Sequence, residues 1–170
     1  HPIKTIKILC RNKYFILITL AFAVIYTSLG LTGGSRIYYA KYVLGDEMLN
    51  STMTMFNYIP TILTIMLIPV FTKRFGKIKA LFVGFLFYAA GLVLEIAGPV
   101  NLPMIYTGLV LQGIGHAALY SCLFAIVGDV VDYSEWKDGI REEGITYSVT
   151  SFGQKIGTGL GTAALGWILA

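Results

Sequence analysis

The chain of 170 residues is 56% hydrophobic, only 13% charged, and has a net charge of +4 at neutral pH. Because a soluble globular domain carries about 25% charged residues, this composition excludes an ordinary soluble enzyme or binding domain. Its basic residues flank apolar segments and do not gather in a polar region, which argues against a nucleic-acid-binding surface.

A helix that crosses a bilayer needs about 20 apolar residues. Nearly uncharged segments of this length occur five times, so we expect an all-α polytopic membrane protein with about five transmembrane helices. The predicted spans are residues 14–35, 53–72, 80–98, 104–128 and 145–168. A transmembrane β-barrel is not expected, because alternating segments of about 10 residues are absent from the sequence.

Basic residues are concentrated in three of the segments between these spans. If the spans alternate in direction, the segments 1–13, 73–79 and 129–144 lie on one side and hold ten of the 13 Lys and Arg residues. Cytoplasmic loops are rich in Lys and Arg. We therefore expect these three segments, including the N-terminal flank, to face the cytoplasm. The expected location of the protein is the cell membrane, which for a bacterium is the inner membrane.

The second span places Asn57, Thr61 and Thr64 on one helix face, since they are four and three residues apart. Such a polar stripe lines a cavity or holds helices together through hydrogen bonds. Both interpretations remain open from the sequence.

The fourth span places Gln112, His116 and Tyr120 on one face by the same spacing. A histidine within a span either carries protons, since its pKa lies near physiological pH, or serves as a hydrogen-bonded packing residue. The sequence does not decide between these two roles for His116.

The last predicted span has two different faces. On one face, glycine recurs every four residues, at Gly153, Gly157 and Gly161. This pattern lets a neighbouring helix approach closely. The polar stripe consists of Ser148, Ser151, Lys155, Thr158 and Thr162. We expect one face to pack against a helix and the other to be wet.

Lys155 lies about 15 Å from the cytoplasmic end of this span, near the bilayer midplane. A lysine at the centre of a membrane helix costs about 2.5–3.5 kcal/mol. It therefore needs a partner, which is a water-filled cavity, a ligand or a carboxylate. A purely structural ion pair is the alternative, although no carboxylate of the sequence is an obvious partner: Glu95 lies near the outer end of its span, and Asp129 and Asp132 lie near the inner side.

Between the last two spans lies "GDVVDYSEWKDGIREEG", in which Asp129 and Asp132 precede Lys137 and Arg141. These charges fit an ordinary solvated loop. They also fit a gate, because an arginine side chain binds carboxylates through a planar fork and can close the end of a cavity.

The region from Asp129 to Lys155 resembles the glycoside–pentoside–hexuronide:cation symporter family, the melibiose permease-like transporters of the major facilitator superfamily. The matching elements are Asp129-x-x-Asp132-Tyr133-x-Glu135, Lys137, Arg141, Glu143-Gly144, Tyr147-Ser148 and Lys155. The resemblance implies part of the C-terminal half of a twelve-span transporter. It also implies symport of a sugar or glycoside with Na⁺ or H⁺ by alternating access.

The resemblance further implies roles for single residues. The implied substrate-binding residues are Lys155, Tyr120, Thr150, Ser151 and Gln154. The implied cytoplasmic gating charges are Asp129, Asp132, Arg141 and Arg74. The coupling cation is implied to bind mainly in the N-terminal half, which this chain does not include, so no metal site is expected within the chain and no other cofactor.

The expected partners are therefore a sugar or glycoside, a coupling cation, the lipid bilayer and the N-terminal half, with no nucleic acid. Alternative functions are a carrier of lipid or another solute, and a non-transporting membrane sensor on the same fold. An enzyme is not expected, because no metal-spaced His and Cys cluster, nucleophile–base pair or phosphate-binding loop occurs in the sequence.

Overall fold

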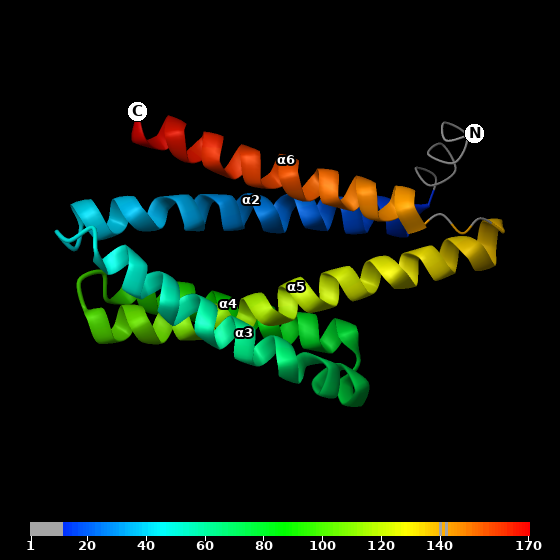
Figure 1. Ribbon diagram of the computed structural model, residues 1–170, viewed down its shortest axis with the longest axis horizontal. Helices are drawn as coiled ribbons and strands as arrows, with labels where there is room; N and C mark the ends of the chain where they lie inside the picture. The colour runs from blue at the N-terminus through cyan, green and yellow to red at the C-terminus, as the bar shows by residue number, and fades with distance from the viewer. Residues whose placement is uncertain (1–11, 140, 142) are drawn as a thin grey trace. The chain divides into compact units, whose positions relative to one another are not determined.

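The computed structural model describes residues 12–139, 141 and 143–170, so most of the predicted N-terminal flank lies outside the described residues. The described chain is helical, as expected, and contains no strand within these residues (Figure 1). Its helices are α2 (Lys13–Tyr42), α3 (Leu49–Phe75), α4 (Lys77–Ala97), α5 (Leu102–Asp138) and α6 (Glu143–Leu169). Each contains one of the five predicted spans, except that α4 ends one residue before the end of the span predicted at 80–98.

Two compact units make up the fold, and each is considered by itself. The first, unit 1, takes the chain up to Ser35 together with Phe124–Ala170, so it contains most of α2, the end of α5 and all of α6. The second, unit 2, takes Arg36–Leu123 and contains the end of α2, all of α3 and α4, and the beginning of α5.

Four of the described helices, α2 to α5, are long and apolar enough to cross a membrane. The chain is therefore a multi-pass membrane protein. Helix α6 has 27 residues but is rich in glycine and hydroxyl side chains, and it is not among these four. It forms the predicted helix, while its crossing of the membrane stays a prediction.

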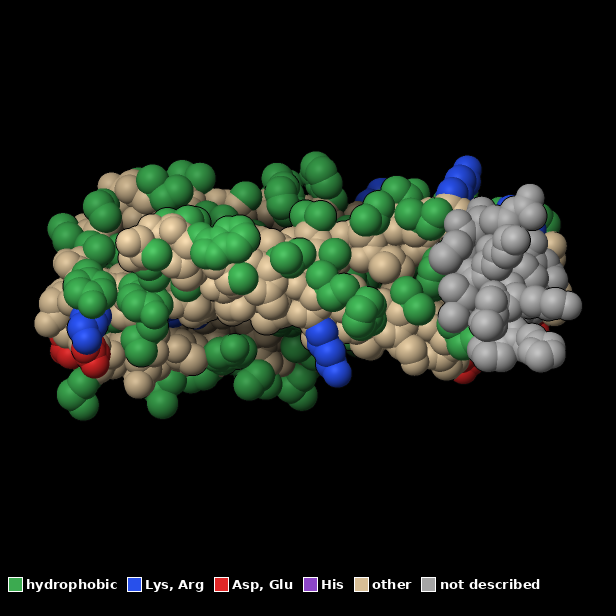
Figure 2. Space-filling view, turned by 90° about the horizontal axis from the view of Figure 1, so that it is seen from above, with side chains coloured by type: hydrophobic (Ala, Val, Ile, Leu, Met, Phe, Trp, Pro, Cys, Tyr) green, Lys and Arg blue, Asp and Glu red, His purple; other side chains and the backbone are tan. Residues whose placement is uncertain are grey.

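Large apolar side chains lie on the outside of this protein. Met66 is 73% exposed and Trp167 is 85% exposed. Hydrophobic side chains are spread over the face drawn in Figure 2, and the Lys and Arg side chains there are few and separate. This distribution suits a protein whose helices face lipid, because lipid does not penalise exposed apolar surface as water does.

Two of the predicted loops are shorter than expected, and the structure corrects their bounds. Residues 129–138 continue α5, since Val130, Val131 and Ser134 are buried and Ser134 Oγ accepts a hydrogen bond of 2.9 Å from Asn12 Nδ2. The helix therefore does not end where its predicted span ends. The loop expected at 73–79 is a one-residue break at Gly76, whose φ of 87° separates α3 from α4.

Hydrogen bonds between α3 and α5 hold unit 2 together. Asn57 Nδ2 donates to the Leu109 carbonyl oxygen at 3.1 Å, and Thr61 Oγ1 donates to the Gly113 carbonyl oxygen at 3.0 Å. Both side chains are buried. The helix-packing interpretation of the polar stripe is therefore confirmed for Asn57 and Thr61.

Candidate functional site

The glycine face of α6 packs directly against α2 in unit 1. Gly153, Gly157 and Gly161 are buried, and a methyl group added at Gly157 would collide with the Ala23 carbonyl oxygen. On the α2 side, a methyl group at Gly30 would lie 2.7 Å from the Thr158 carbonyl oxygen. The predicted close approach of a neighbouring helix is confirmed.

The polar stripe of α6 lies on the exposed side of the helix. Ser148, Lys155, Thr158 and Thr162 are exposed, and Ser151 is partly exposed. The hydroxyl groups of Thr158 and Thr162 donate to carbonyl oxygens one turn earlier in α6, at 3.0 and 3.1 Å. Within the part of the chain that the structure describes, Lys155 Nζ makes no ion pair or hydrogen bond, so its charge has no partner there.

The other three substrate residues predicted on α6 differ in position. Ser151 and Gln154 are partly exposed and flank Lys155. Thr150 is fully buried, and its hydroxyl donates to the carbonyl oxygens of Thr146 and Tyr147, each at 3.0 Å. Thr150 therefore shares the packed side of α6 with the glycines, and in unit 1 it is not accessible beside Lys155.

Tyr120, the fifth predicted substrate residue, belongs to unit 2 and is partly buried. Its ring centroid lies 5.7 Å from that of His116, which in turn lies 5.0 Å from the ring of Tyr88. His116 is buried between these rings, and its Nε2 has no hydrogen-bond partner among the described residues. The aromatic contacts support packing for His116, and the proton-carrier interpretation stays untested.

The junction between α5 and α6 contains a small network of charges in unit 1. Arg141 Nη1 lies 3.3 Å from Asp132 Oδ1 and 2.5 Å from Glu135 Oε2, while Arg141 Nη2 lies 2.6 Å from Glu143 Oε1. The hydrogen bonds that Arg141 donates to Glu135 and then to Glu143 raise the pKa of Arg141, so its guanidinium stays charged. One arginine thus ties the end of α5 to the start of α6.

A hollow of about 230 Å³ adjoins this network. Its walls include Asp132, Arg141 and Glu143 together with Tyr147 of α6 and Gly128 of α5. The ion pairs therefore border an opening and are not scattered over a flat surface.

Two of the predicted gating charges lie outside the ion pairs just described. Asp129 precedes Asp132 by one turn of α5. Arg74 belongs to unit 2, at the end of α3, where its guanidinium carbon lies 5.4 Å from the centroid of the Phe75 ring.

The sequence reasoning missed Glu135 and Glu143 as partners of Arg141. Glu135 follows Asp132 by three residues, a spacing that puts both carboxylates on one helix face once α5 is known to continue past residue 128. Among the described residues, no three His, Cys, Asp or Glu side chains are placed to hold a metal ion.

The helices and the two-faced α6 define a polytopic α-helical membrane protein, and comparison with known proteins gives its family. The model of the family described as MFS/sugar transport protein matches residues 2–170. The chain therefore belongs to this family, and the resemblance to glycoside–pentoside–hexuronide transporters of the major facilitator superfamily is confirmed.

Three curated relatives illustrate the match. The isoprimeverose transporter of Lactiplantibacillus pentosus is 30% identical over 99% of this chain. The glucuronide carrier protein homolog of Escherichia coli (strain K12) is 28% identical over 97%, and the putative sulfoquinovose importer of Salmonella typhimurium is 32% identical over 94%. The chain spans 36%, 36% and 34% of the lengths of these relatives. No solved structure matches the chain at a significant level.

Proposed function

We propose that this chain forms part of a secondary active transporter that carries a sugar or glycoside together with Na⁺ or H⁺ by alternating access. The observation that carries the proposal is the division of α6 into a glycine face packed on α2 and an exposed polar face centred on Lys155. The family supports it, since the relatives are named for transport of isoprimeverose, glucuronide and sulfoquinovose. Because the chain spans about a third of these relatives, the activity belongs to the longer protein.

Lys155 is proposed to bind the substrate directly. An ammonium group offers three hydrogen-bond donors, which suit the hydroxyl oxygens of a sugar. Ser151 and Gln154 lie partly exposed beside it and can add further hydrogen bonds. Thr150 is buried in unit 1 and takes no direct part in this proposal, although the resemblance implies one.

The network around Arg141 is proposed to act as a cytoplasmic gate. Its three ion pairs join the end of α5 to the start of α6 beside a hollow, so breaking them frees the two helix ends to separate. Asp129 and Arg74 are proposed as further members, on the strength of the family resemblance alone. In this proposal the N-terminal flank faces the cytoplasm.

The coupling cation is proposed to bind in the part of the transporter that this chain does not contain. This part of the proposal rests on the family resemblance, which implies a cation site mainly in the N-terminal half.

Uptake by membrane vesicles tests the proposed function. The full-length protein should accumulate a labelled glycoside under an imposed Na⁺ or H⁺ gradient, and Lys155→Ala should abolish this accumulation. Lys41→Ala, which removes an exposed lysine from the end of α2, is the matched control and should retain uptake. Gradient-driven uptake that is unchanged in Lys155→Ala would count against the role of this lysine. In a separate thermal-shift measurement, stabilisation of the purified full-length protein by lysolipids and not by sugars would favour a lipid carrier.

A further inference from the structure

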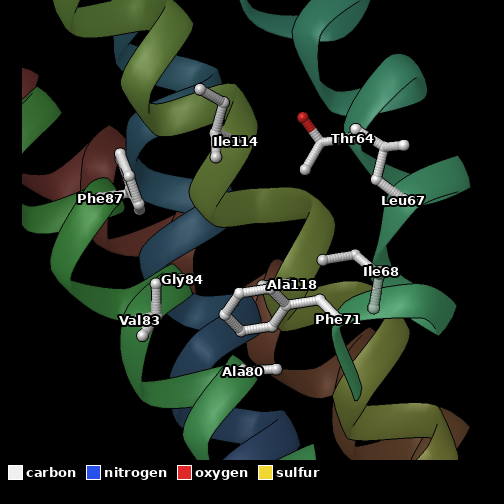
Figure 3. Close-up of a pocket in the computed structure, with 10 residues that line it drawn as sticks. All are labelled: Thr64, Leu67, Ile68, Phe71, Ala80, Val83, Gly84, Phe87, Ile114 and Ala118. Carbon is white, nitrogen blue, oxygen red and sulfur yellow. The ribbon is translucent and has the colours of Figure 1, made fainter. Parts of the chain in front are cut away.

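Unit 2 contains an apolar pocket of about 220 Å³ between three helices. Figure 3 shows α3 on one side, α4 on the other and α5 between them, with Phe71 extending from α3 toward Ala80 and Ala118. The lining side chains are Thr64, Leu67, Ile68 and Phe71 of α3, Ala80, Val83, Gly84 and Phe87 of α4, and Ile114 and Ala118 of α5. The Thr64 hydroxyl is the single polar group among them.

Small side chains create this pocket. Gly84 lets α4 touch α5, because a methyl group added there would collide with the Ala118 side chain. Ala80 and Ala118 are buried at the floor, whereas Leu67 is 65% exposed at the rim. The hollow is thus a recess with a closed floor and an open side.

The chemistry of the lining selects an apolar occupant. A water molecule needs two to four polar partners, which this lining does not offer. A flexible hydrocarbon chain fits such a recess, and the helices around it are built to lie in a bilayer. The lined parts of α3 and α4 each cover seven residue steps, from Thr64 to Phe71 and from Ala80 to Phe87, or about 10 Å.

Basic residues stand at one end of the pocket. Arg74 follows Phe71 by three residues on α3, so it continues the same helix face, and Lys79 immediately precedes Ala80 on α4. Both side chains are exposed. Lys73 and Lys77 add to the positive charge of this helix junction. An occupant with a hydrocarbon chain and a negatively charged headgroup fits this arrangement, because the chain meets the apolar lining and the headgroup meets the basic residues.

We propose that this pocket binds one acyl chain of an anionic phospholipid, with the lipid phosphate held at the basic α3–α4 junction. Juxtamembrane clusters of Lys and Arg attract anionic headgroups. The proposed lipid differs from the lipids that surround any membrane helix. One of its acyl chains inserts between α3 and α4 and contacts α5.

Photo-crosslinking of the full-length protein in nanodiscs tests the proposal. The probes are phosphatidylglycerol and phosphatidylcholine that carry a diazirine in the acyl chain, and mass spectrometry locates the labelled residues. Phosphatidylglycerol should label the pocket lining, notably Phe71 and Phe87, several-fold more than phosphatidylcholine does. Equal labelling by the two lipids, or no label in the pocket, would overturn the proposal, the latter because another helix covers it.

Matched variants separate the headgroup from the acyl chain. Arg74→Gln with Lys79→Gln should lower phosphatidylglycerol labelling several-fold, to the level seen with phosphatidylcholine, since basic residues near the membrane surface attract anionic headgroups. Lys13→Gln with Lys137→Gln removes the same charge elsewhere and should leave labelling unchanged. Val83→Phe fills the pocket and should remove the label from both lipids, whereas Val93→Phe, on an exposed part of α4 outside the lining, should not. Labelling that resists both the charge and the filling variants would refute the site.

Discussion

Gly157 of α6 lies so close to Ala23 of α2 that its Cα faces the Ala23 carbonyl oxygen with no room for a side chain between them. The same relationship recurs one turn later, where Gly161 faces the Thr27 carbonyl oxygen. These contacts fix the rotation of α6 about its axis. They thereby determine that Lys155, and not the glycines, is exposed.

Adding a methyl group at this contact should destabilise the protein. Gly157→Ala forces α6 away from α2, and overpacking of this kind typically costs about 1–3 kcal/mol. Gly159→Ala is the matched control, because a methyl group at Gly159 meets nothing within 4 Å and alanine favours helix over glycine. The melting temperature of the detergent-purified full-length protein should fall for Gly157→Ala and stay level or rise for Gly159→Ala. Equal melting temperatures would show that the close helix contact is absent.

The hydrogen bond from Thr61 to α5 should be measurable in the same assay. Thr61→Val keeps the shape of the side chain but removes a hydroxyl that is shared between the Asn57 carbonyl oxygen of α3, at 2.8 Å, and the Gly113 carbonyl oxygen of α5, at 3.0 Å. Interhelical bonds contribute about 0.6 kcal/mol on average in membranes. Thr54→Val is the control, since the Thr54 hydroxyl donates within α3 to the Asn50 carbonyl oxygen. A greater loss of stability for Thr54→Val than for Thr61→Val would contradict the packing role of Thr61.

Arg141→Gln should slow transport without unfolding the protein. Its ion pairs are exposed, with about half of the Arg141 side chain accessible, and exposed pairs contribute little to stability. We expect a several-fold lower initial uptake rate and an unchanged melting temperature. Lys41→Gln breaks the exposed Lys41–Glu47 pair of unit 2 and should leave uptake intact. A normal uptake rate in Arg141→Gln would argue for an ordinary solvated loop.

Arg141 should also stay charged throughout the alkaline range. Its hydrogen bonds to Glu135 and Glu143 raise its pKa above an already high value. Because folding raises the pKa of Arg141, its ion pairs stabilise the folded protein fully at pH values below the pKa of this side chain in the unfolded state. This stabilisation is lost only as the pH rises through the pKa in the folded state. We therefore expect the difference in uptake between Arg141→Gln and the unaltered protein to be constant from pH 7 to about pH 9. A difference that disappears over this range would contradict the proposed charge.

Helix periodicity carried the sequence interpretation furthest. The spacing of Gly153, Gly157 and Gly161 correctly predicted a packed face, because three- and four-residue steps fix which side chains share a side of any helix. The same rule places Thr150 about 140° from Lys155, on the packed side. The family resemblance nevertheless included Thr150 among the substrate residues.

Other features depend on contacts that periodicity does not contain. The continuation of α5 to Asp138 depends on the burial of Val131 and Ser134 in unit 1. The ion pairs of Arg141 with Glu135 and Glu143 depend in turn on this continuation of α5 and on the residue at which α6 begins. The apolar pocket of unit 2 arises from small residues on three different helices, so no single segment predicts it.

The central proposal is that the Lys155 face of α6 lines a water-filled path where Lys155 itself holds the sugar. Cysteine accessibility tests it most directly, using Ser151→Cys in full-length protein whose other reactive cysteines have been replaced, and a membrane-impermeant thiol reagent. We predict that the reagent labels this cysteine, that the transported sugar slows the labelling, and that adding Lys155→Ala preserves the labelling but removes the protection. A cysteine that the reagent cannot reach, or protection that persists without Lys155, would contradict the proposal.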